Sequence, residues 1–231
     1  MGVSGMDAIG ILGGSFDPIH VGHLQLARDA LANLPIAEVH LLLAAQPWQK
    51  EVLTAAQHRA RMIELAIEQE LPFTRRRMIL DLRELERGGP TYTVDTLRDL
   101  RTAMGPEIPL VLIMGADQFA RFDTWREWEA IPELAHLAVA KRAGAAPALN
   151  EPLQRLRNAR YLKYAGDLVD SPAGHIVDLA MTPVDASATE VRALLGRPTE
   201  PADATRLATL VPPAVLDYIR SHQLYAGPHG H

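Results

Sequence analysis

Two glycines, an aspartate, a proline and two histidines lie within eleven residues near the start of the chain, in the stretch GGSFDPIHVGH from Gly13 to His23. An apolar run precedes this stretch and a helical pattern follows it, so it forms the turn between a strand and a helix. His20 and His23 are three residues apart, which places both imidazoles on one side of the helix start. Free N–H groups and two histidines there make a compact anion site, for which phosphate is the natural ligand.

Two other interpretations compete for the histidine pair. Histidines ligate zinc, but the chain offers neither a cysteine nor an obvious partner motif for such a site. Histidines at a helix start also serve as caps or as core residues. The two glycines before them allow a ligand to approach the backbone closely, which favours the phosphate interpretation.

A second candidate site lies far downstream, in the stretch VDASATEVRALLG from Val184 to Gly196. Asp185, Ser187 and Thr189 precede a helical run, and residues of these types are good helix caps. Arg192 follows one turn into the helix, so two hydroxyls, backbone N–H groups and a guanidinium converge on one point. Arginine binds phosphate oxygens bidentately, so this set is typical of a phosphate site, with simple capping as the alternative.

The elements that must position these residues follow a regular rhythm. Short apolar runs such as AIGIL, AEVHLLLA, PLVLIMG and LAHLAVA alternate with amphipathic helical segments. This pattern predicts an α/β fold with a Rossmann-like parallel sheet, helices on both faces and ligands at the carboxyl ends of the strands. We expect one domain over residues 1–231, with an α/β core at 8–183 and a C-terminal helical segment at 184–224. Lys141–Pro152 is the best candidate for a flexible loop.

Composition narrows the chemistry further. The 231 residues are 48% hydrophobic, include no cysteine and carry a formal net charge of -5. Catalysis by a thiol is therefore excluded, and the charge argues against a nucleic-acid partner. We expect a cytoplasmic protein without a membrane partner, because neither a signal peptide nor an apolar run of about 20 residues is present. The basic cluster Arg75–Arg77 is interpreted as a solvated strand edge or loop.

The motifs resemble those of a known family. GGSFDPIHVGHL resembles the GxFDPxHxGH signature of the adenylyltransferases, and SATEVR resembles their second signature. The segments GGPTYTVDTL, MGADQF and FDTWREWEAI are similar to the bacterial nicotinate mononucleotide adenylyltransferases. The resemblance implies transfer of AMP from ATP to nicotinate mononucleotide, with Mg²⁺ as helper and with nicotinate adenine dinucleotide and pyrophosphate as products. Such a reaction needs no general base and no covalent intermediate, since the acceptor is an ionised phosphate.

The resemblance also implies roles for individual residues. His20, His23 and Arg192 would be catalytic, His23 acting on the charge that develops in the transition state. The residues implied to bind ATP are Gly13, Gly14, Ser15, Phe16, Ser187 and Thr189. Those implied to bind the acceptor are Lys50, Thr91, Tyr92, Thr93, Asp117, Trp125 and Arg142. Trp125 would stack on the nicotinate ring, and a buried core tryptophan is the alternative there.

One loop departs from the family pattern. The family usually shows Pro-His-Lys or Pro-His-Arg after the second strand, whereas this chain has Gln49 at the histidine position and retains Lys50. We therefore expect Lys50 to contact the acceptor phosphate and assign no role to Gln46, Trp48 or Gln49.

Other functions remain open from the sequence alone. One alternative is another adenylyltransferase of the same fold that uses nicotinamide mononucleotide or phosphopantetheine as acceptor. A regulatory nucleotide-binding module that has lost turnover is the alternative of another class, although both histidines and Arg192 are retained. The sequence is also compatible with a homo-oligomer.

Overall fold

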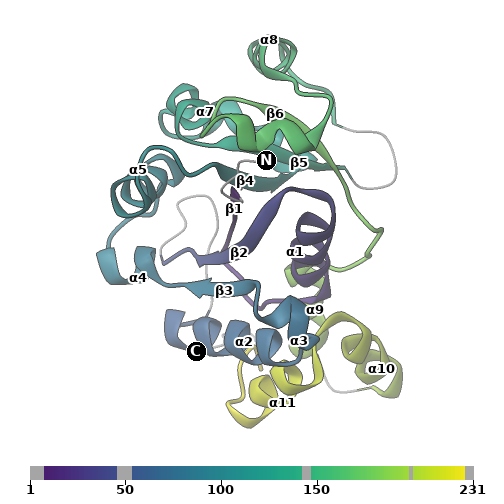
Figure 1. The fold of residues 1–231 in the computed structure, drawn as a ribbon. Coiled ribbons are helices and arrows are strands. Elements are labelled where there is room, and N and C mark those ends of the chain that lie inside the picture. Colours follow the sequence, from purple (N-terminus) through teal and green to yellow (C-terminus); the bar gives the residue numbers. More distant parts are fainter. Residues whose placement is uncertain (1–7, 46–53, 142–146, 198–199, 227–231) are drawn as a thin grey trace.

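A single parallel sheet organises the molecule (Figure 1). The computed structural model describes residues 8–45, 54–141, 147–197 and 200–226. Its six strands have the spatial order β3-β2-β1-β4-β5-β6, and all neighbours are parallel. The strands are β1 (Ala8–Gly14), β2 (Ile36–Leu43), β3 (Met78–Asp81), β4 (Leu110–Gly115), β5 (His136–Lys141) and β6 (Ile176–Ala180). This order is that of a Rossmann-like fold, so the predicted fold class is confirmed.

Helices connect the strands and extend the chain beyond the last one. The α-helices are α1 (Val21–Asn33), α2 (Ala56–Glu68), α3 (Pro72–Arg75), α4 (Arg83–Arg87), α5 (Thr93–Met104), α6 (Ala116–Phe119), α7 (Ile131–Leu134), α8 (Glu151–Arg160), α9 (Ala188–Leu195), α10 (Pro201–Leu210) and α11 (Pro213–Ser221). Short 3₁₀ turns are η1 (Phe122–Thr124), η2 (Trp128–Ala130) and η3 (Ala165–Asp170).

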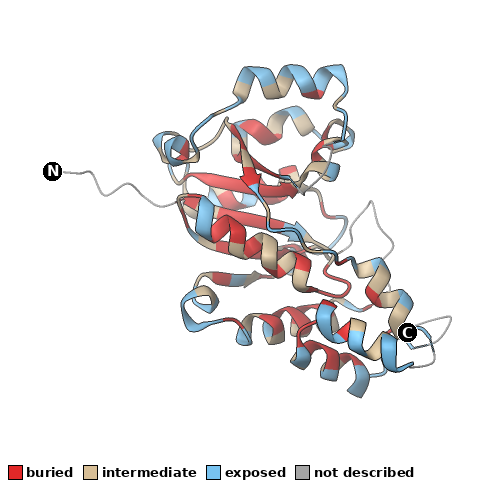
Figure 2. Ribbon diagram, turned by 90° about the vertical axis from the view of Figure 1, so that its right-hand side faces the viewer, coloured by how far each residue is buried: buried red, intermediate tan, exposed pale blue. Residues whose placement is uncertain are grey.

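Two apolar cores lie on opposite faces of the sheet. Leu41 and Ile113 belong to the core that contains residues of α1 and α2. Their chain neighbours Leu42 and Leu112 belong to the other core, which contains residues of α5 and α7. Successive strand residues point to opposite faces, so a strand covered on both sides is apolar throughout. Figure 2 shows the buried strands between helices whose outer surfaces are exposed.

The C-terminal helices pack on the core that contains α1 and α2. Leu207 of α10, together with Val215 and Ile219 of α11, joins Leu24 of α1 in one buried cluster. Figure 1 shows α9, α10 and α11 close together beside α2. Because this segment has no separate core, we propose that the chain forms one domain over residues 1–231, with 184–224 as its helical extension.

The segment between β5 and α8 is shorter than the loop predicted from the sequence. The predicted loop at Lys141–Pro152 is too long at both ends, because Lys141 ends β5 and α8 begins at Glu151. Asn150 explains the second boundary, since its side chain accepts a hydrogen bond from the N–H of Leu153 and caps α8.

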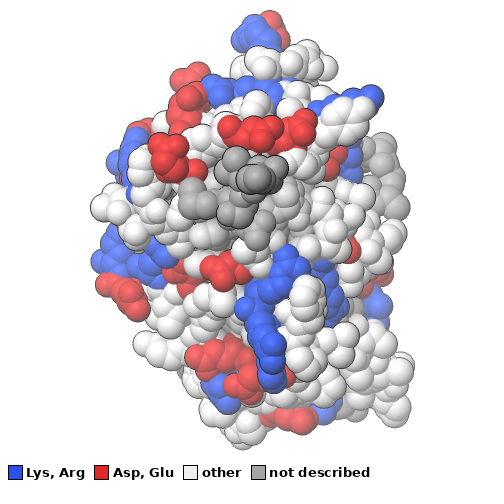
Figure 3. Space-filling view, in the orientation of Figure 1, with Lys and Arg blue, Asp and Glu red and all other residues white. Residues whose placement is uncertain are grey.

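Arg75 and Arg76 are exposed at the end of α3, just before the edge strand β3, and basic side chains gather over this region in Figure 3.

Candidate active site

The turn after β1 is closed by its two histidines. The N–H of Gly22 donates to Nδ1 of His20 at 3.1 Å, and the N–H of His20 donates to Nδ1 of His23 at 3.3 Å. The two rings stack with their centroids 3.8 Å apart. Because Nδ1 accepts in both rings, each neutral imidazole carries its proton on Nε2, as a hydrogen-bond donor. Capping and ligand binding are therefore compatible roles, since each uses a different ring nitrogen.

Gly22 lies close to the ring of His20. A Cβ atom added at Gly22 would lie 3.0 Å from both Cε1 and Nδ1 of His20, closer than side chains normally pack. The same atom would lie 3.6 Å from the carbonyl oxygen of Ala186, in the segment before α9. This second distance is an ordinary van der Waals contact, so the first helix already lies against the segment before α9.

Arg192 joins the second signature to this turn. Its Nη1 donates to the carbonyl oxygen of Asp17 at 2.6 Å, across 175 residues of sequence. Ser187 is the N-cap of α9, and its Oγ accepts from the N–H of Glu190 at 3.1 Å. Thr189 is exposed in the first turn of the same helix. Both stretches that the sequence analysis selected for phosphate binding therefore lie against each other.

Asp29 of α1 anchors the segment that leads to α9. Its carboxylate accepts the N–H of Thr182 at 2.7 Å and the hydroxyl of Thr182 at 3.0 Å. Thr182 follows β6, whereas Asp29 is a buried residue of α1. This contact fixes the segment that leads to Ser187 relative to the helix that begins at His20.

A buried arginine supports the turn from beneath and was not anticipated from the sequence. Arg59 of α2 is 1% exposed and donates to the carbonyl oxygens of Ser15 and Ala44, each at 2.8 Å. Burial lowers the pKa of Arg59, while the nearby carboxylate of Asp17 favours its charged form. Because arginine stays charged in proteins, the loops after β1 and β2 are held together around a positive charge.

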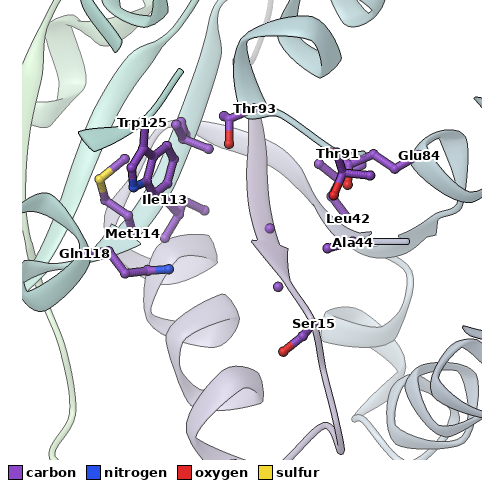
Figure 4. A pocket seen from close by; sticks show the side chains of 13 residues that line it. Ser15, Leu42, Ala44, Glu84, Thr91, Thr93, Ile113, Met114, Gln118 and Trp125 are labelled. Atoms are coloured by element: carbon purple, nitrogen blue, oxygen red, sulfur yellow. The ribbon is translucent and has the colours of Figure 1, made fainter. Parts of the chain in front are cut away.

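A cleft opens at the carboxyl ends of β1 and β4, where the strand order reverses (Figure 4). Its volume is about 130 Å³. Six predicted site residues line it, namely Gly13, Gly14, Ser15, Thr91, Thr93 and Trp125. The remaining lining residues are Leu42, Ala44, Glu84, Leu112, Ile113, Met114 and Gln118. The structure thus brings together residues from the first signature, the TYT segment and the TW segment.

Trp125 and Tyr92 have different surroundings. Trp125 is half-buried, lines the cleft and contacts Phe122 edge to face at 5.4 Å between centroids. Trp125 therefore packs against the apolar core that contains residues of α5 and also borders the cleft. The ring of Tyr92 packs instead against the guanidinium of Arg126, 4.6 Å from the ring centroid, and Tyr92 is the N-cap residue of α5. Tyr92 itself is not among the residues that line the cleft, whereas its neighbours Thr91 and Thr93 are.

The start of α5 supplies backbone donors beside the cleft. Tyr92 makes no side-chain capping hydrogen bond, and its carbonyl oxygen accepts from the N–H groups of Asp95 and Thr96. The helix provides no acceptor for the N–H groups of Thr93 and Val94, because an α-helix leaves its first donors unpaired. Thr93 lines the cleft, so the partial positive charge of this helix start lies at the edge of the cleft.

Glu84 is a buried carboxyl group in the cleft wall that the sequence analysis missed. It is 4% exposed, and the hydroxyl of Thr96 donates to its Oε1 at 2.6 Å. Burial raises the pKa of Glu84, although the hydrogen bond from Thr96 opposes this shift. An Arg-Glu-rich segment such as RELER is typical of a solvated surface, so its sequence gives no signal of burial.

The remaining predicted residues differ in how far they can be placed. Asp117 is exposed on α6. A Cβ atom added at Gly115 would lie only 2.5 Å from its Oδ1, so the carboxylate packs against this glycine. Its neighbour Gln118 lines the cleft, while Asp117 is not among the lining residues. Lys50 and Arg142 lie outside the described residues, as do Gln46, Trp48 and Gln49.

Comparisons with known proteins agree with this geometry. A cytidylyltransferase-like family model matches residues 11–194. The chain is 40% identical to a probable nicotinate-nucleotide adenylyltransferase of Dechloromonas aromatica, over 95% of this chain and 98% of that protein. It is 41% identical to one of Bordetella petrii, over 95% of this chain and 100% of that protein.

Among solved structures, Plasmodium falciparum nicotinic acid mononucleotide adenylyltransferase complexed with NaAD has a similar fold, with a TM-score of 0.73 at 21% identity. The match covers 95% of this chain and 97% of that chain. Among the described helices, none has the length and apolar character needed to cross a bilayer. The extent of the two curated matches and of the family model shows that the chain belongs to the cytidylyltransferase-like family and, within it, to the nicotinate-nucleotide adenylyltransferases.

Proposed function

We propose that this chain transfers AMP from ATP to nicotinate mononucleotide, forming nicotinate adenine dinucleotide and pyrophosphate. The observation that carries the proposal is the contact between the two phosphate motifs, made by Arg192 on the carbonyl oxygen of Asp17 at 2.6 Å. The cleft beside the first motif combines an aromatic wall with the start of α5. A triphosphate and a pyridine carboxylate would therefore find suitable partners at adjacent places.

The chemistry needs positioning and charge stabilisation. A phosphate oxygen of the acceptor forms a bond to the α-phosphorus of ATP, while the bond from that phosphorus to the bridging oxygen of pyrophosphate breaks. The acceptor oxygen is already ionised, so no proton has to be removed. Preorganised donors and an aligned approach account for catalysis of this type.

On the ATP side, His20 and His23 would donate from Nε2 to phosphate oxygens. We assign the transition-state contact to His23, because it extends from the first turn of α1, whereas His20 is the N-cap residue itself. Ser187, Thr189 and Arg192 would hold the β- and γ-phosphates that leave together. The backbone of Gly13, Gly14, Ser15 and Phe16 would line the nucleotide path. At Gly13 an added Cβ atom would meet nothing within 4 Å, which leaves room for the nucleotide.

On the acceptor side, the indole of Trp125 would stack on the pyridine ring. The carboxylate would accept from the N–H groups at the start of α5, with Thr91, Tyr92 and Thr93 forming that edge of the site. Asp117 would contact a ribose. Lys50 and Arg142 are proposed for the acceptor phosphate from the sequence resemblance alone.

Mg²⁺ would enter the site with ATP. Among the residues that the structure describes, no group of three or more His, Asp or Glu side chains could hold a metal ion. The triphosphate itself supplies oxygen ligands, and Mg²⁺ commonly keeps several waters. The residues present therefore fit an ion carried by the substrate, which would neutralise phosphate charge when bound.

A pyrophosphate-release assay tests the proposal. The purified chain is given ATP with nicotinate mononucleotide, nicotinamide mononucleotide or phosphopantetheine, each at several concentrations. We expect the highest kcat/KM with nicotinate mononucleotide. Turnover with another acceptor alone would refute the substrate assignment, and no turnover with any acceptor would favour a regulatory nucleotide-binding module.

A further inference from the structure

A tyrosine far from the first signature in sequence makes a buried hydrogen bond to it. The hydroxyl of Tyr225 donates to Oδ1 of Asp17 at 2.5 Å, across 208 residues. Both side chains are buried, with Tyr225 5% exposed and Asp17 2% exposed. Burial and the neighbouring carboxylate raise the pKa of Tyr225, so the phenol keeps its proton and acts as the donor.

Asp17 connects this tyrosine to the proposed phosphate ligand. The carboxylate of Asp17 accepts from Tyr225, while its carbonyl oxygen accepts from Arg192 at 2.6 Å. Asp17 also precedes His20 by three residues in the same turn. A shift of Asp17 would therefore displace the guanidinium on one side and the histidine pair on the other.

The backbone of Tyr225 indicates that its place is held firmly. Its φ is 63°, in the left-handed region that bulky residues rarely adopt. Such a conformation persists where the surrounding contacts determine it. Here those contacts are its buried ring, which belongs to the core shared with α1, and its hydrogen bond to Asp17.

We propose that Tyr225 is a positioning residue for the triphosphate of ATP, which acts by fixing Asp17 and, through it, Arg192. This inference rests on the proposed function of the same site. The reason it affects ATP rather than the acceptor is spatial, because neither Tyr225 nor Asp17 lines the cleft that holds Thr93 and Trp125. Small displacements of positioning groups have large effects on reactivity.

Tyr218 offers a matched control. Its hydroxyl is hydrogen-bonded to Nδ1 of His58 at 2.9 Å, within the contact between α11 and α2. Tyr218→Phe therefore removes one tyrosine hydrogen bond from the same C-terminal segment without touching Asp17. A purely structural contribution of such bonds would affect both variants alike.

The experiment compares Tyr225→Phe and Tyr218→Phe in the full chain. For each variant, calorimetry gives the Kd of a non-hydrolysable ATP analogue, kinetics give KM and kcat for both substrates, and thermal denaturation gives Tm. We expect Tyr225→Phe to weaken analogue binding and to lower kcat/KM for ATP by about tenfold, the typical effect of losing a hydrogen bond to a charged group. The KM for nicotinate mononucleotide should stay within about twofold, a readout on the acceptor side that separates positioning from general destabilisation. Tyr218→Phe should leave analogue binding unchanged.

An Arg192→Lys background tests the proposed route. If Tyr225 acts through Arg192, Tyr225→Phe should cost less in this background than in the wild type, because the two substitutions then share one effect. Full additivity, wild-type analogue binding by Tyr225→Phe, or an equal loss in Tyr218→Phe would each overturn the inference. Analogue binding needs no turnover, so its selective loss would support the role of Tyr225 even if the proposed acceptor proved wrong.

Discussion

The starts of α1 and α5 differ in their capping, because side chains accept from the backbone N–H groups in α1 and not in α5. In α1, His20 and His23 use Nδ1 to accept backbone N–H groups, which leaves Nε2 of each neutral ring as the nitrogen that donates. In α5, the N-cap residue Tyr92 makes no side-chain capping bond, so the helix itself offers no acceptor to the N–H groups of Thr93 and Val94. Imidazole donors extend farther from the helix than backbone N–H groups do.

This difference matches the two anions that we propose. A triphosphate is large and gains charge at the departing pyrophosphate, so side-chain donors can follow it into the transition state. A pyridine carboxylate takes no part in the bond changes and needs only fixed recognition. We infer that the α1 side governs kcat and that the α5 side governs which acceptor binds.

Of the substitutions that test this difference between α1 and α5, His23→Ala should have the largest effect. We expect kcat to fall by roughly 10² to 10³ with a smaller change in the KM for ATP, because one transition-state donor is removed. His58→Ala is the matched control, since His58 is also the third residue of its helix and lies outside the site. Steady-state kinetics of both variants, with Tm as a check on folding, decide the question. Near wild-type kcat in His23→Ala would remove the α1 side from the chemistry.

The second test concerns the acceptor substituent. Nicotinate and nicotinamide differ little in size, so only hydrogen-bond polarity can separate them. A carboxylate satisfies N–H donors with both oxygens, whereas an amide presents its own NH₂ to one of them. A buried unpaired donor costs about 1–3 kcal/mol, and losing charge-assisted bonds adds to this.

We therefore expect a preference for nicotinate mononucleotide of roughly 10² or more in kcat/KM. The two mononucleotides are compared under one set of conditions with ATP saturating. Equal values would contradict recognition by the start of α5, while adenylyl transfer itself would remain supported.

The fold class and the two phosphate motifs could be predicted from the sequence because their signals are local. Apolar runs predicted β1, β2, β4 and β5, and the turn chemistry of Gly13–His23 placed the first motif at a strand end. The short edge strand β3 has four residues, too few for a clear period. Its formation depends on pairing with β2.

Residues that depend on distant contacts could not be found in this way. Arg59 lies in an amphipathic helix with the charge of a surface residue, yet carbonyl groups from loops after two strands surround it. Tyr225 is buried through contacts with a residue 208 positions away. Neither position carries a local pattern that distinguishes it from an exposed residue.

Arg192→Lys tests the link between the two phosphate motifs. One donor of the guanidinium already binds the carbonyl oxygen of Asp17, and the others would hold the departing phosphates. A lysine can satisfy one partner as a point charge but cannot reproduce the fork. We expect kcat/KM for ATP to fall by about tenfold or more, measured by the same pyrophosphate assay, on the basis that a hydrogen bond to a charged group is worth about 1.5–3 kcal/mol. Full activity of the lysine variant would contradict the assigned role.

The smallest expected effect is on the α5 side, at Glu84. Because burial raises its pKa in the folded state, the ionised form is disfavoured there relative to the unfolded chain. The stability from this group is therefore fully present below the unfolded pKa and is lost as pH rises through the folded pKa. Glu84→Gln keeps an acceptor for Thr96 without the charge, so it should raise Tm slightly at pH 7.

The same substitution separates two effects of Glu84 on the cleft. The Tm difference between Glu84→Gln and the wild type should shrink as pH falls, which thermal denaturation across pH measures directly. Removing a negative charge from the cleft wall should also lower the KM for nicotinate mononucleotide modestly, because that acceptor carries a carboxylate of the same sign. A higher KM would instead mean that the charge of Glu84 is needed to hold Thr96 and the start of α5 in place. Both sites would then depend on a buried carboxylate, Asp17 near the start of α1 and Glu84 near the start of α5. The difference between the two sites would be limited to the capping of the helices, which histidine side chains provide in α1 and no side chain provides in α5.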